Sequence, residues 1–247
     1  MNKFQLSIII PVYNETCRIV PTLNHLVKYL SSRDFKSEVI ICDDGSTDDT
    51  LEVVREFSSR NSNVPEPSIR TVSLPHRGKG NAVREGMILA NGKIRLMCDA
   101  DLAMSVEQID KFLNKMAEGY DVVIGSREVK GARRFDEPKL RHFMGKIFNW
   151  YVRIVAVGGF SDTQCGYKCF TSNAANILFK RQKLDGWSFD VELLMMATRK
   201  SMKIFELPID WYHKERSKVS FGPASIQMVR DTLLTRIRYE LGMYRCI

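Results

Sequence analysis

Acidic residues follow three apolar segments in the first half of the sequence. Glu15 comes after the first segment, Asp43 and Asp44 after the second, and Asp99 and Asp101 after a later one. Each group alone is consistent with a turn or a helix cap. If the segments are parallel strands of one sheet, their carboxyl ends meet at the same edge, so together they predict one acidic site.

Asp99 and Asp101 are separated by a single residue. In an extended segment two such side chains project to the same side. Paired carboxylates suit a hard divalent cation that also binds diphosphate oxygens, so we expect a Mg²⁺ or Mn²⁺ site formed by Asp99 and Asp101. Such a cation neutralises the charge that develops on a departing diphosphate, which predicts a nucleotide sugar as the donor substrate.

The segment Arg77-Gly78-Lys79-Gly80-Asn81 stands at the expected start of a helix. Glycine lets the backbone approach a ligand there, and Lys79 supplies a positive charge. The alternative is a tight turn with a solvated lysine. The Gly-x-x-x-x-Gly-Lys-Ser/Thr spacing of a P-loop is missing, so hydrolysis of a nucleoside triphosphate is not indicated.

Short β-branched runs alternate with helical patterns up to about residue 128, which predicts an α/β fold with a mostly parallel, Rossmann-like sheet flanked by helices. The expected strands are 6–12, 39–42, 69–74, 94–98 and 122–124. Ser105-Val-Glu-Gln108 has the spacing of a capping box at a helix start. In such a fold ligands bind beyond the carboxyl ends of the strands, where the acidic residues stand.

The second half of the sequence is more helical. Its expected helices are 140–157, 174–179, 189–199 and 224–242, and its expected strands are 167–170 and 204–211. The sequence contains no evident internal repeat or linker, and its six cysteines do not have the spacing of a zinc site. A single domain over residues 1–247 is the simplest division.

The formal net charge of +8 indicates an anionic partner. The sequence has no helix-turn-helix, zinc-finger or RNP-type signature, so we do not expect it to bind nucleic acid. Basic residues gather at about 130–153 and 214–245 and are accompanied by aromatic residues. This pattern favours a membrane surface that carries phosphate groups.

One side of the expected helix at 140–157 is apolar, with basic residues near its margin. The apolar side carries Phe143, Ile147, Trp150, Tyr151 and Ile154, and the margin carries Lys146 and Arg153. This pattern is typical of an interfacial helix, although a helix packed on the core has it too. Because the sequence shows no secretory signal and no apolar run of about 18 residues, we expect a cytoplasmic protein that associates peripherally with the cytoplasmic face of a membrane.

Four motifs, in their order, resemble those of inverting family-two glycosyltransferases, whose fold is called GT-A. They are Pro11-Val-Tyr-Asn-Glu15, Asp43-Asp-Gly-Ser-Thr-Asp48, Asp99-Ala-Asp101 and Gly125-Ser-Arg127. Within that family, further motifs resemble dolichyl-phosphate β-glucosyltransferases and related polyprenyl-phosphate glycosyltransferases. These motifs lie at 162–170, 187–194, 227–231 and 236–239.

The resemblance implies that residues 1–128 bind the nucleotide sugar and that residues 129–247 bind the acceptor and carry the interfacial helices. Asp44 would contact the base, Asp99 the ribose or the metal, and Asp101 the metal and the diphosphate. The implied donor-binding residues are Pro11, Tyr13, Glu15, Asp43, Asp44, Lys79, Asp99 and Asp101. The implied acceptor-phosphate residues are Arg127, Arg141 and Lys218, and the implied catalytic residues are Asp101, Arg127 and Asp190.

The resemblance further implies that glucose passes from UDP-glucose to dolichyl or another polyprenyl phosphate with inversion. Two alternatives stay open: a mannosyltransferase that uses GDP-mannose, and a non-catalytic module that binds a nucleotide sugar or an anionic lipid. The related mannosyltransferases place a metal-binding Gln two residues after the second aspartate, and this sequence has Ala103 there. We therefore expect a metal site with two aspartates.

Overall fold

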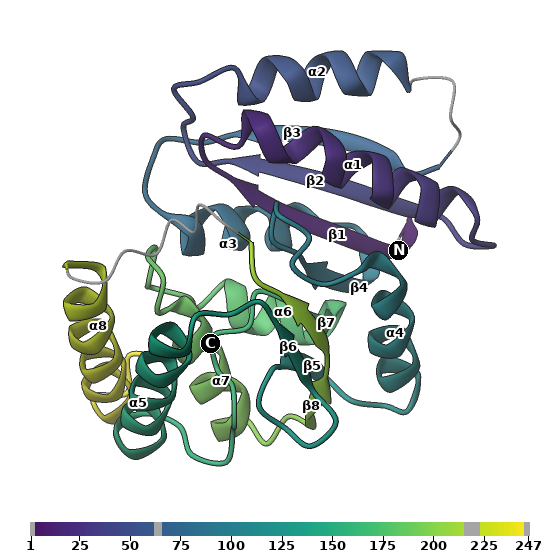
Figure 1. Ribbon diagram of the computed structural model, residues 1–247. Helices are drawn as coiled ribbons and strands as arrows, with labels where there is room; N and C mark the ends of the chain where they lie inside the picture. Colours follow the sequence, from purple (N-terminus) through teal and green to yellow (C-terminus); the bar gives the residue numbers. More distant parts are fainter. Residues whose placement is uncertain (1–2, 62–65, 215–222, 245–247) are drawn as a thin grey trace.

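A seven-stranded sheet and the helices around it make up most of the chain (Figure 1). The computed structural model describes residues 3–61, 66–214 and 223–244. The strands are β1 (Phe4–Val12), β2 (Ser37–Asp43), β3 (Ser68–Ser73), β4 (Gly92–Met97), β5 (Val122–Ser126), β6 (Arg133–Phe135), β7 (Lys168–Thr171), β8 (Ile204–Pro208) and β9 (Asp210–Tyr212). The helices are α1 (Thr16–Ser31), α2 (Thr50–Arg60), α3 (Lys79–Leu89), α4 (Ile109–Ala117), α5 (Lys139–Val155), α6 (Ser172–Phe179), α7 (Phe189–Arg199) and α8 (Pro223–Glu240), with a 3₁₀ turn η1 (Val106–Gln108).

The strand order in the large sheet is β3-β2-β1-β4-β7-β5-β8. β7 runs antiparallel to both of its neighbours, whereas β1, β2, β3 and β4 pair in parallel, as do β5 and β8. The prediction of a mostly parallel sheet flanked by helices is therefore confirmed. β7 and β8 come from the second half of the chain, so strands from both halves share one sheet.

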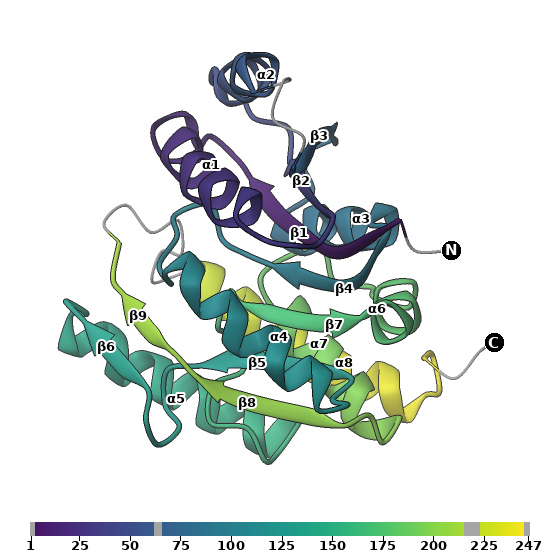
Figure 2. The same ribbon diagram turned by 90° about the vertical axis from the view of Figure 1, so that its right-hand side faces the viewer.

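Helices cover both faces of the sheet (Figure 2). Successive residues of β1 enter opposite cores, because side chains alternate along a strand. Ile8 and Ile10 pack in the core that includes α1, α2 and α4, and Ile9 packs in the core that includes α3, α6 and α7. Burial on both faces explains why the strands read as continuous apolar runs.

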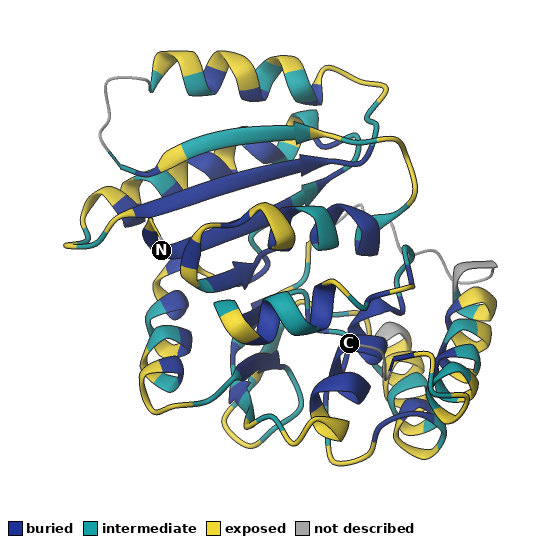
Figure 3. Cartoon of the chain, turned by 180° about the vertical axis from the view of Figure 1, so that it is seen from behind, coloured by how far each residue is buried: buried dark blue, intermediate teal, exposed yellow. Residues whose placement is uncertain are grey.

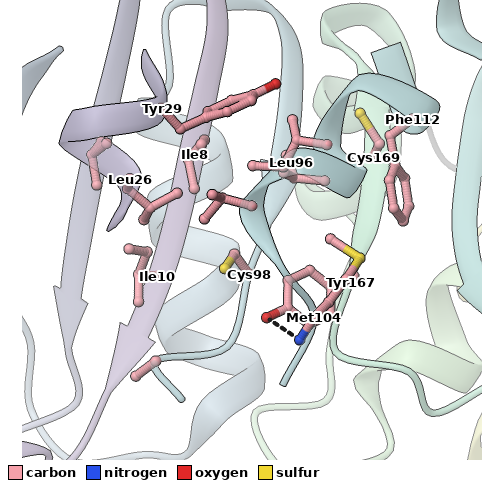
Figure 4. Packing of buried hydrophobic residues seen from close by; sticks show 14 of the residues in the cluster. Ile8, Ile10, Leu26, Tyr29, Leu96, Cys98, Met104, Phe112, Tyr167 and Cys169 are labelled. Atoms are coloured by element: carbon pink, nitrogen blue, oxygen red, sulfur yellow. Dashed lines mark hydrogen bonds between the residues drawn. The ribbon is translucent and has the colours of Figure 1, made fainter. Parts of the chain in front are cut away.

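The core also fixes the segment that follows β4. Met104 and Tyr167 lie in the same cluster as Leu96 and Cys98, and the Met104 N–H donates to the Tyr167 hydroxyl at 3.3 Å (Figure 4). Tyr167 is buried and directly precedes β7. The turn that carries Asp99 and Asp101 is therefore anchored at both of its ends.

The predicted strand at 204–211 is divided into two strands that belong to different sheets. β8 ends at Pro208, which has no N–H to continue the ladder, and β9 pairs with β6 in a separate two-stranded sheet. The Ile209 N–H between them donates to the Ser126 carbonyl at 3.2 Å. The prediction of one continuous strand was wrong for this reason.

The predicted capping box at Ser105 is also absent. The Ser105 side chain makes no cap hydrogen bond, and the segment begins with η1 before α4 starts at Ile109. The Gln108 amide instead exchanges two hydrogen bonds of 2.9 Å with the backbone of Asp210. A long-range partner has replaced the local one that the sequence pattern predicts.

Two helices at one end of the molecule, α5 and α8, pack against each other. Both have many exposed residues (Figure 3), and some of these form apolar stripes. The exposed residues are Leu140, Phe143, Ile147, Trp150 and Ile154 on α5 and Ile226, Val229, Leu233 and Ile237 on α8. Tyr151 does not join the α5 stripe as predicted, because its ring packs inward and its hydroxyl donates to the Val229 carbonyl at 3.0 Å. In the described part of the chain no helix is long and apolar enough to span a membrane.

Candidate functional site

The carboxyl ends of β1, β2 and β4 lie side by side at one edge of the sheet. Val12 at the end of β1 is in register with Asp43 at the end of β2. On the other side of β1, the Cys98 N–H donates to the Ile9 carbonyl at 2.9 Å. The segments that carry Glu15, Asp44 and Asp99 therefore leave the sheet from neighbouring strands at the same edge.

The loops after β1 and β2 are tied to each other. The Asn14 N–H donates to the Ser46 hydroxyl at 2.9 Å, and the Asn14 side-chain oxygen accepts from the Thr47 N–H at 2.8 Å. The Asp43 carboxylate is buried and accepts from the Ser46 N–H. Asp43 thus shapes its own turn, while Pro11 lies within β1.

Asp44 holds the segment that leads from β3 into α3. Its carboxylate accepts from the backbone N–H groups of Arg77 and Gly78 at 2.9 Å, and His76 Nδ1 lies 2.8 Å from it. The His76 ring stacks on Tyr13, with the ring centroids 4.3 Å apart. An aromatic pair and a buried carboxylate therefore stand together at the edge where β1, β2 and β3 end.

Lys79, the first residue of α3, reaches across to the segment after β4. Its ammonium lies 2.6 Å from Asp99 Oδ1. Burial lowers the pKa of Lys79, but the charges of Asp99 and Asp190 outweigh this effect and raise the pKa above its ordinary value. Lys79 is therefore held as a cation beside the acidic pair.

Asp99 and Asp101 lie on a turn rather than in the extended segment that we expect from the sequence. β4 ends at Met97, and Leu102 has a left-handed backbone with a φ of 45°. Burial and the nearby charge of Asp99 raise the pKa of Asp101, so the two carboxylates repel each other. A cation between them would relieve this repulsion, which is what a metal-binding pair requires.

The residues at this edge fit a divalent cation whose remaining ligands come from a substrate. No group of three or more His, Cys, Asp or Glu side chains that could hold a metal occurs among residues 3–61, 66–214 and 223–244. Mg²⁺ in nucleotide enzymes is commonly bound by one or two carboxylates together with phosphate oxygens and water. Asp99 and Asp101 meet that requirement, and the charge of Arg18, which also pairs with Glu15 at 2.6 Å, acts on Asp101.

The glycines around Lys79 allow a close contact within the protein. A Cβ at Gly78 would lie 2.6 Å from the Asp185 carbonyl oxygen, and a Cβ at Gly80 would lie 2.7 Å from the Leu184 carbonyl oxygen. The sequence pattern suggests that these glycines admit a ligand. The backbone that approaches them in the structure belongs to the segment before α7.

α7 brings Asp190 to the same site. Asp190 is buried and lies 2.8 Å from the ammonium of Lys168, which is also buried. Burial raises the pKa of Asp190, and the charges of Lys168 and Lys79 oppose this shift. Trp187, just before α7, has its ring under the Lys79 ammonium at 5.5 Å from the ring centroid.

Arg127 is engaged by a carboxylate of the protein. Its guanidinium makes a two-pronged ion pair with Asp162, with nitrogen–oxygen distances of 2.6 and 2.9 Å. Its face lies over the Trp211 ring at 5.3 Å. The predicted phosphate-binding role of Arg127 stays a prediction, and the geometry gives it a structural partner that the sequence did not reveal.

The other two predicted acceptor-phosphate residues are only partly placed. Arg141 belongs to the first turn of α5, and its side chain lies outside the described atoms. Lys218 lies outside the described residues. Their roles therefore stay predictions.

Sequence reasoning missed Gly166, His76 and Trp187. A Cβ at Gly166 would lie 1.8 Å from Asp99 Oδ2, so a larger residue would displace this carboxylate. His76 was missed because no other histidine stands near it in the sequence to suggest a shared site. Only the position of Gly166 and Trp187 inside family-like motifs could have drawn attention to them.

Curated proteins resemble this chain over nearly its whole length. The dolichyl-phosphate β-glucosyltransferase ALG5C of Trichomonas vaginalis is 34% identical, with 96% of this chain and 72% of that protein covered. The dolichyl-phosphate β-glucosyltransferase of Saccharomyces cerevisiae is 33% identical, with 97% and 76% covered. The human dolichyl-phosphate β-glucosyltransferase is 34% identical, with 98% and 78% covered.

Solved structures share the fold. Glucosyl-3-phosphoglycerate synthase of Mycobacterium tuberculosis in complex with UDP superposes with a TM-score of 0.68 at 20% identity, covering 95% of this chain and 80% of that one. The same enzyme in complex with Mn²⁺ and UDP-glucose gives a TM-score of 0.65 at 20% identity, with 95% and 79% covered. The GT-A fold expected from the sequence is thereby confirmed.

The sequence also matches a family profile over residues 7–184, from β1 to the segment before α7. This range contains the acidic residues at the strand ends, Lys79, and the Arg127–Asp162 pair. Together with relatives that are at least 33% identical over nearly the full chain, the match leaves one assignment. The chain is a glycosyltransferase and belongs to glycosyl transferase family 2.

Proposed function

We propose that this protein transfers glucose from UDP-glucose to dolichyl phosphate or a similar polyprenyl phosphate, with inversion at the anomeric carbon, and that one domain over residues 1–247 carries both substrate sites. One observation carries the proposal. The similarity to dolichyl-phosphate β-glucosyltransferases extends over 96–98% of the chain, and so continues beyond residue 184 into α7 and α8. The family profile alone, which ends at residue 184, does not include α7 and α8.

The donor site of this proposal lies at the edge where β1, β2 and β4 end. The Tyr13–His76 pair supports the uracil base and Asp44 lies beside it, as the geometry of the three side chains allows. Asp99 and Asp101 hold Mg²⁺ or Mn²⁺, which when bound offsets negative charge on the departing diphosphate. Lys79 adds a fixed positive charge next to Asp99.

The acceptor needs positioning more than it needs a base. A phosphate monoester has a second pKa near about 6, so its oxygen is already anionic at neutral pH. One acceptor oxygen attacks the anomeric carbon while the bond from that carbon to the UDP oxygen breaks, and UDP leaves with the electron pair. In this scheme Arg127, Arg141 and Lys218 hold the phosphate, and Asp190 orients a substrate from the base of the site.

The lipid tail of the acceptor explains the exposed stripes on α5 and α8. We propose that both stripes enter the headgroup region at the cytoplasmic face of a membrane, so that the protein associates peripherally. Trp150 and Ile154 are each more than 60% exposed, a large apolar exposure for side chains on a soluble surface. A phosphate on a membrane-bound lipid could then reach the site without leaving the bilayer.

The test is a substrate panel. Purified protein is incubated with UDP-glucose, UDP-galactose or GDP-mannose, together with dolichyl phosphate or a shorter polyprenyl phosphate, and the lipid product is identified by mass. We expect a glucosyl phosphoryl lipid, with the β configuration by NMR, and its loss on addition of EDTA. A mannosyl product, or no lipid product from any pair, contradicts the proposal.

The two substrate pockets are separated by a second measurement. Arg141→Ala and Lys218→Ala should raise the KM for the lipid phosphate and leave the KM for UDP-glucose unchanged. The opposite pattern would move these residues to the donor pocket.

A further inference from the structure

The Lys79 segment rests on the segment just before α7. The Asn81 N–H donates to the Asp185 carbonyl at 3.1 Å, and the Gln182 amide donates to the Gly80 carbonyl at 2.8 Å. Arg84 adds an ion pair of 3.0 Å with the Asp185 carboxylate. Residues 182–187, called here the supporting loop, therefore fix the position and direction of the first turn of α3.

One carboxylate holds the supporting loop in place. Glu192, in the first turn of α7, is fully buried and accepts from the backbone N–H groups of Lys183 at 3.0 Å and Leu184 at 2.9 Å. Burial raises the pKa of Glu192, and its hydrogen bonds oppose that shift. A buried carboxylate that keeps these bonds is a rigid anchor, since leaving any of its partners unpaired costs free energy.

Glu192 is itself held by a residue of the turn that follows α8. The Tyr244 hydroxyl donates to Glu192 Oε1 at 2.6 Å, and Tyr244 is buried. α8 touches the same region a second time, because the Ser188 hydroxyl donates to the Met228 carbonyl at 3.3 Å. α8, which carries an exposed apolar stripe, and the turn after it are thus linked through Ser188 and Glu192 to the residues that follow and hold the supporting loop.

The supporting loop also carries a side chain of the donor site. Trp187 ends the loop, and its ring faces the Lys79 ammonium. Lys79 in turn pairs with Asp99 at 2.6 Å. A shift of the loop would move Trp187 and the start of α3 together, and with them the ammonium that pairs with Asp99.

We infer that Glu192, held by Tyr244, is a positioning residue for the donor diphosphate and acts through the supporting loop on Lys79. This inference rests on the proposed nucleotide-sugar donor. Glu192 contacts neither substrate, because its oxygens are occupied by Lys183, Leu184 and Tyr244. Glu192 instead determines the position of the Lys79 ammonium when UDP binds.

The test compares two Tyr→Phe substitutions that each remove one hydroxyl from a carboxylate. Tyr244→Phe breaks the bond to Glu192, and Tyr29→Phe breaks a bond of 2.8 Å to Asp110, between α1 and α4. We measure Mg²⁺-dependent UDP binding by calorimetry and thermal unfolding for both variants. Tyr244→Phe should weaken UDP binding by about threefold to tenfold, and Tyr29→Phe should leave it unchanged.

A double-mutant cycle shows whether the effect passes through Lys79. In a Lys79→Met background, Tyr244→Phe should no longer weaken UDP binding, because the cation that it positions is gone. An equal loss in both backgrounds, or no loss in either, overturns the inference. Glu192→Gln serves as a second variant and should follow the same non-additive pattern.

Steady-state kinetics distinguish a positioning role of Glu192 from a general effect on the fold. Tyr244→Phe should raise the KM for UDP-glucose and leave the KM for the lipid phosphate unchanged, whereas general loosening of the fold would change both. Failure of the unaltered protein to bind UDP would instead overturn the proposed function. Equal UDP affinity of the unaltered protein and Tyr244→Phe would overturn this inference alone.

Discussion

The Lys79 ammonium and the Asp99 carboxylate lie 2.6 Å apart, although the two residues follow different strands and are separated by 20 positions. The pair offsets one of the two acidic charges before any ligand arrives. Lys79→Met should therefore lower UDP affinity by about tenfold or more, since a charge-assisted contact to the diphosphate is lost. Lys79→Arg should restore part of it. Calorimetry with Mg²⁺ and UDP measures both, and unchanged affinity in Lys79→Met contradicts the assignment.

Gly166 should be intolerant of any side chain. The Cβ of Gly166→Ala would collide with Asp99 Oδ2, so the carboxylate must turn away from the metal site. We expect at least a tenfold fall in kcat/KM for UDP-glucose and a weaker response to Mn²⁺. Gly158→Ala is the matched control, because its Cβ would meet only the Arg153 carbonyl oxygen at 3.6 Å. Full activity in Gly166→Ala would show that Asp99 does not need its observed orientation.

Asp101→Ala should nearly abolish transfer while the protein stays folded. Half of the proposed metal-binding pair is then gone, and the contribution of a metal to charge stabilisation is several kcal/mol, a loss of about a hundredfold or more. Asp34→Ala removes an exposed carboxylate elsewhere and should leave turnover unchanged. Transfer rates with and without EDTA, together with circular dichroism, test this. Turnover that persists in Asp101→Ala would exclude the metal mechanism.

The Arg127–Asp162 pair should make stability depend on acid pH. Burial alone would raise the pKa of the Asp162 carboxyl from its ordinary 3.8, but the charge and hydrogen bonds of Arg127 lower it to about 2. A carboxyl whose pKa is lowered on folding stabilises the protein above its ordinary pKa, and this contribution disappears as the pH falls through the folded value.

Asp162→Asn should therefore cost about 2 kcal/mol of unfolding free energy at pH 7. The difference from the unaltered protein should shrink between about pH 4 and pH 2, as the native carboxyl also becomes neutral. Urea unfolding at a series of pH values measures this. A difference that stays constant over that range would mean that the ion pair is not its source.

The exposed stripe of α5 should bind anionic vesicles. Trp150→Glu combined with Ile154→Glu should reduce co-sedimentation with these vesicles at low salt, because two apolar anchors become negative charges. Ile88→Glu with Leu89→Glu changes two exposed apolar residues on α3 and should have no effect. If the α5 variant unfolds, or if the unaltered protein does not bind vesicles, α5 is a core helix and not a membrane contact.

The sequence predicted those features that depend on local patterns. The strands of the first half lie within two residues of their predicted bounds. β1 and β2 are apolar runs buried on both faces, whereas β3 is a partly exposed edge strand. The predicted helix at 189–199 has the bounds observed for α7. The position of the acidic residues at one edge followed from the expected parallel sheet, since parallel strands bring their carboxyl ends together.

Features that depend on long-range packing could not be predicted. Gly78 and Gly80 looked like ligand-binding glycines, and nothing near them in sequence indicates that they lie against residues 184–186. The ion pair of Arg127 was not predicted, because its partner, Asp162, stands 35 positions away. The segment 204–211 was predicted as one strand because the pattern of apolar residues is the same in both of its parts. It does not show that β8 ends at Pro208 and that β9 belongs to another sheet.

The place of β7 has a consequence for synthesis on the ribosome. β7 pairs with β4 through Ile94 and Thr171, and with β5 through Val122 and Phe170. Both neighbours are translated well before β7, so the large sheet cannot close until residue 171 has left the exit tunnel. Until then the edges of β4 and β5 that pair with β7 stay free, and unpaired edges are where chains add to one another. We expect the nascent chain to depend on a chaperone during this interval. The free edge of β4, the strand that Asp99 follows, is one of the edges that a chaperone would cover.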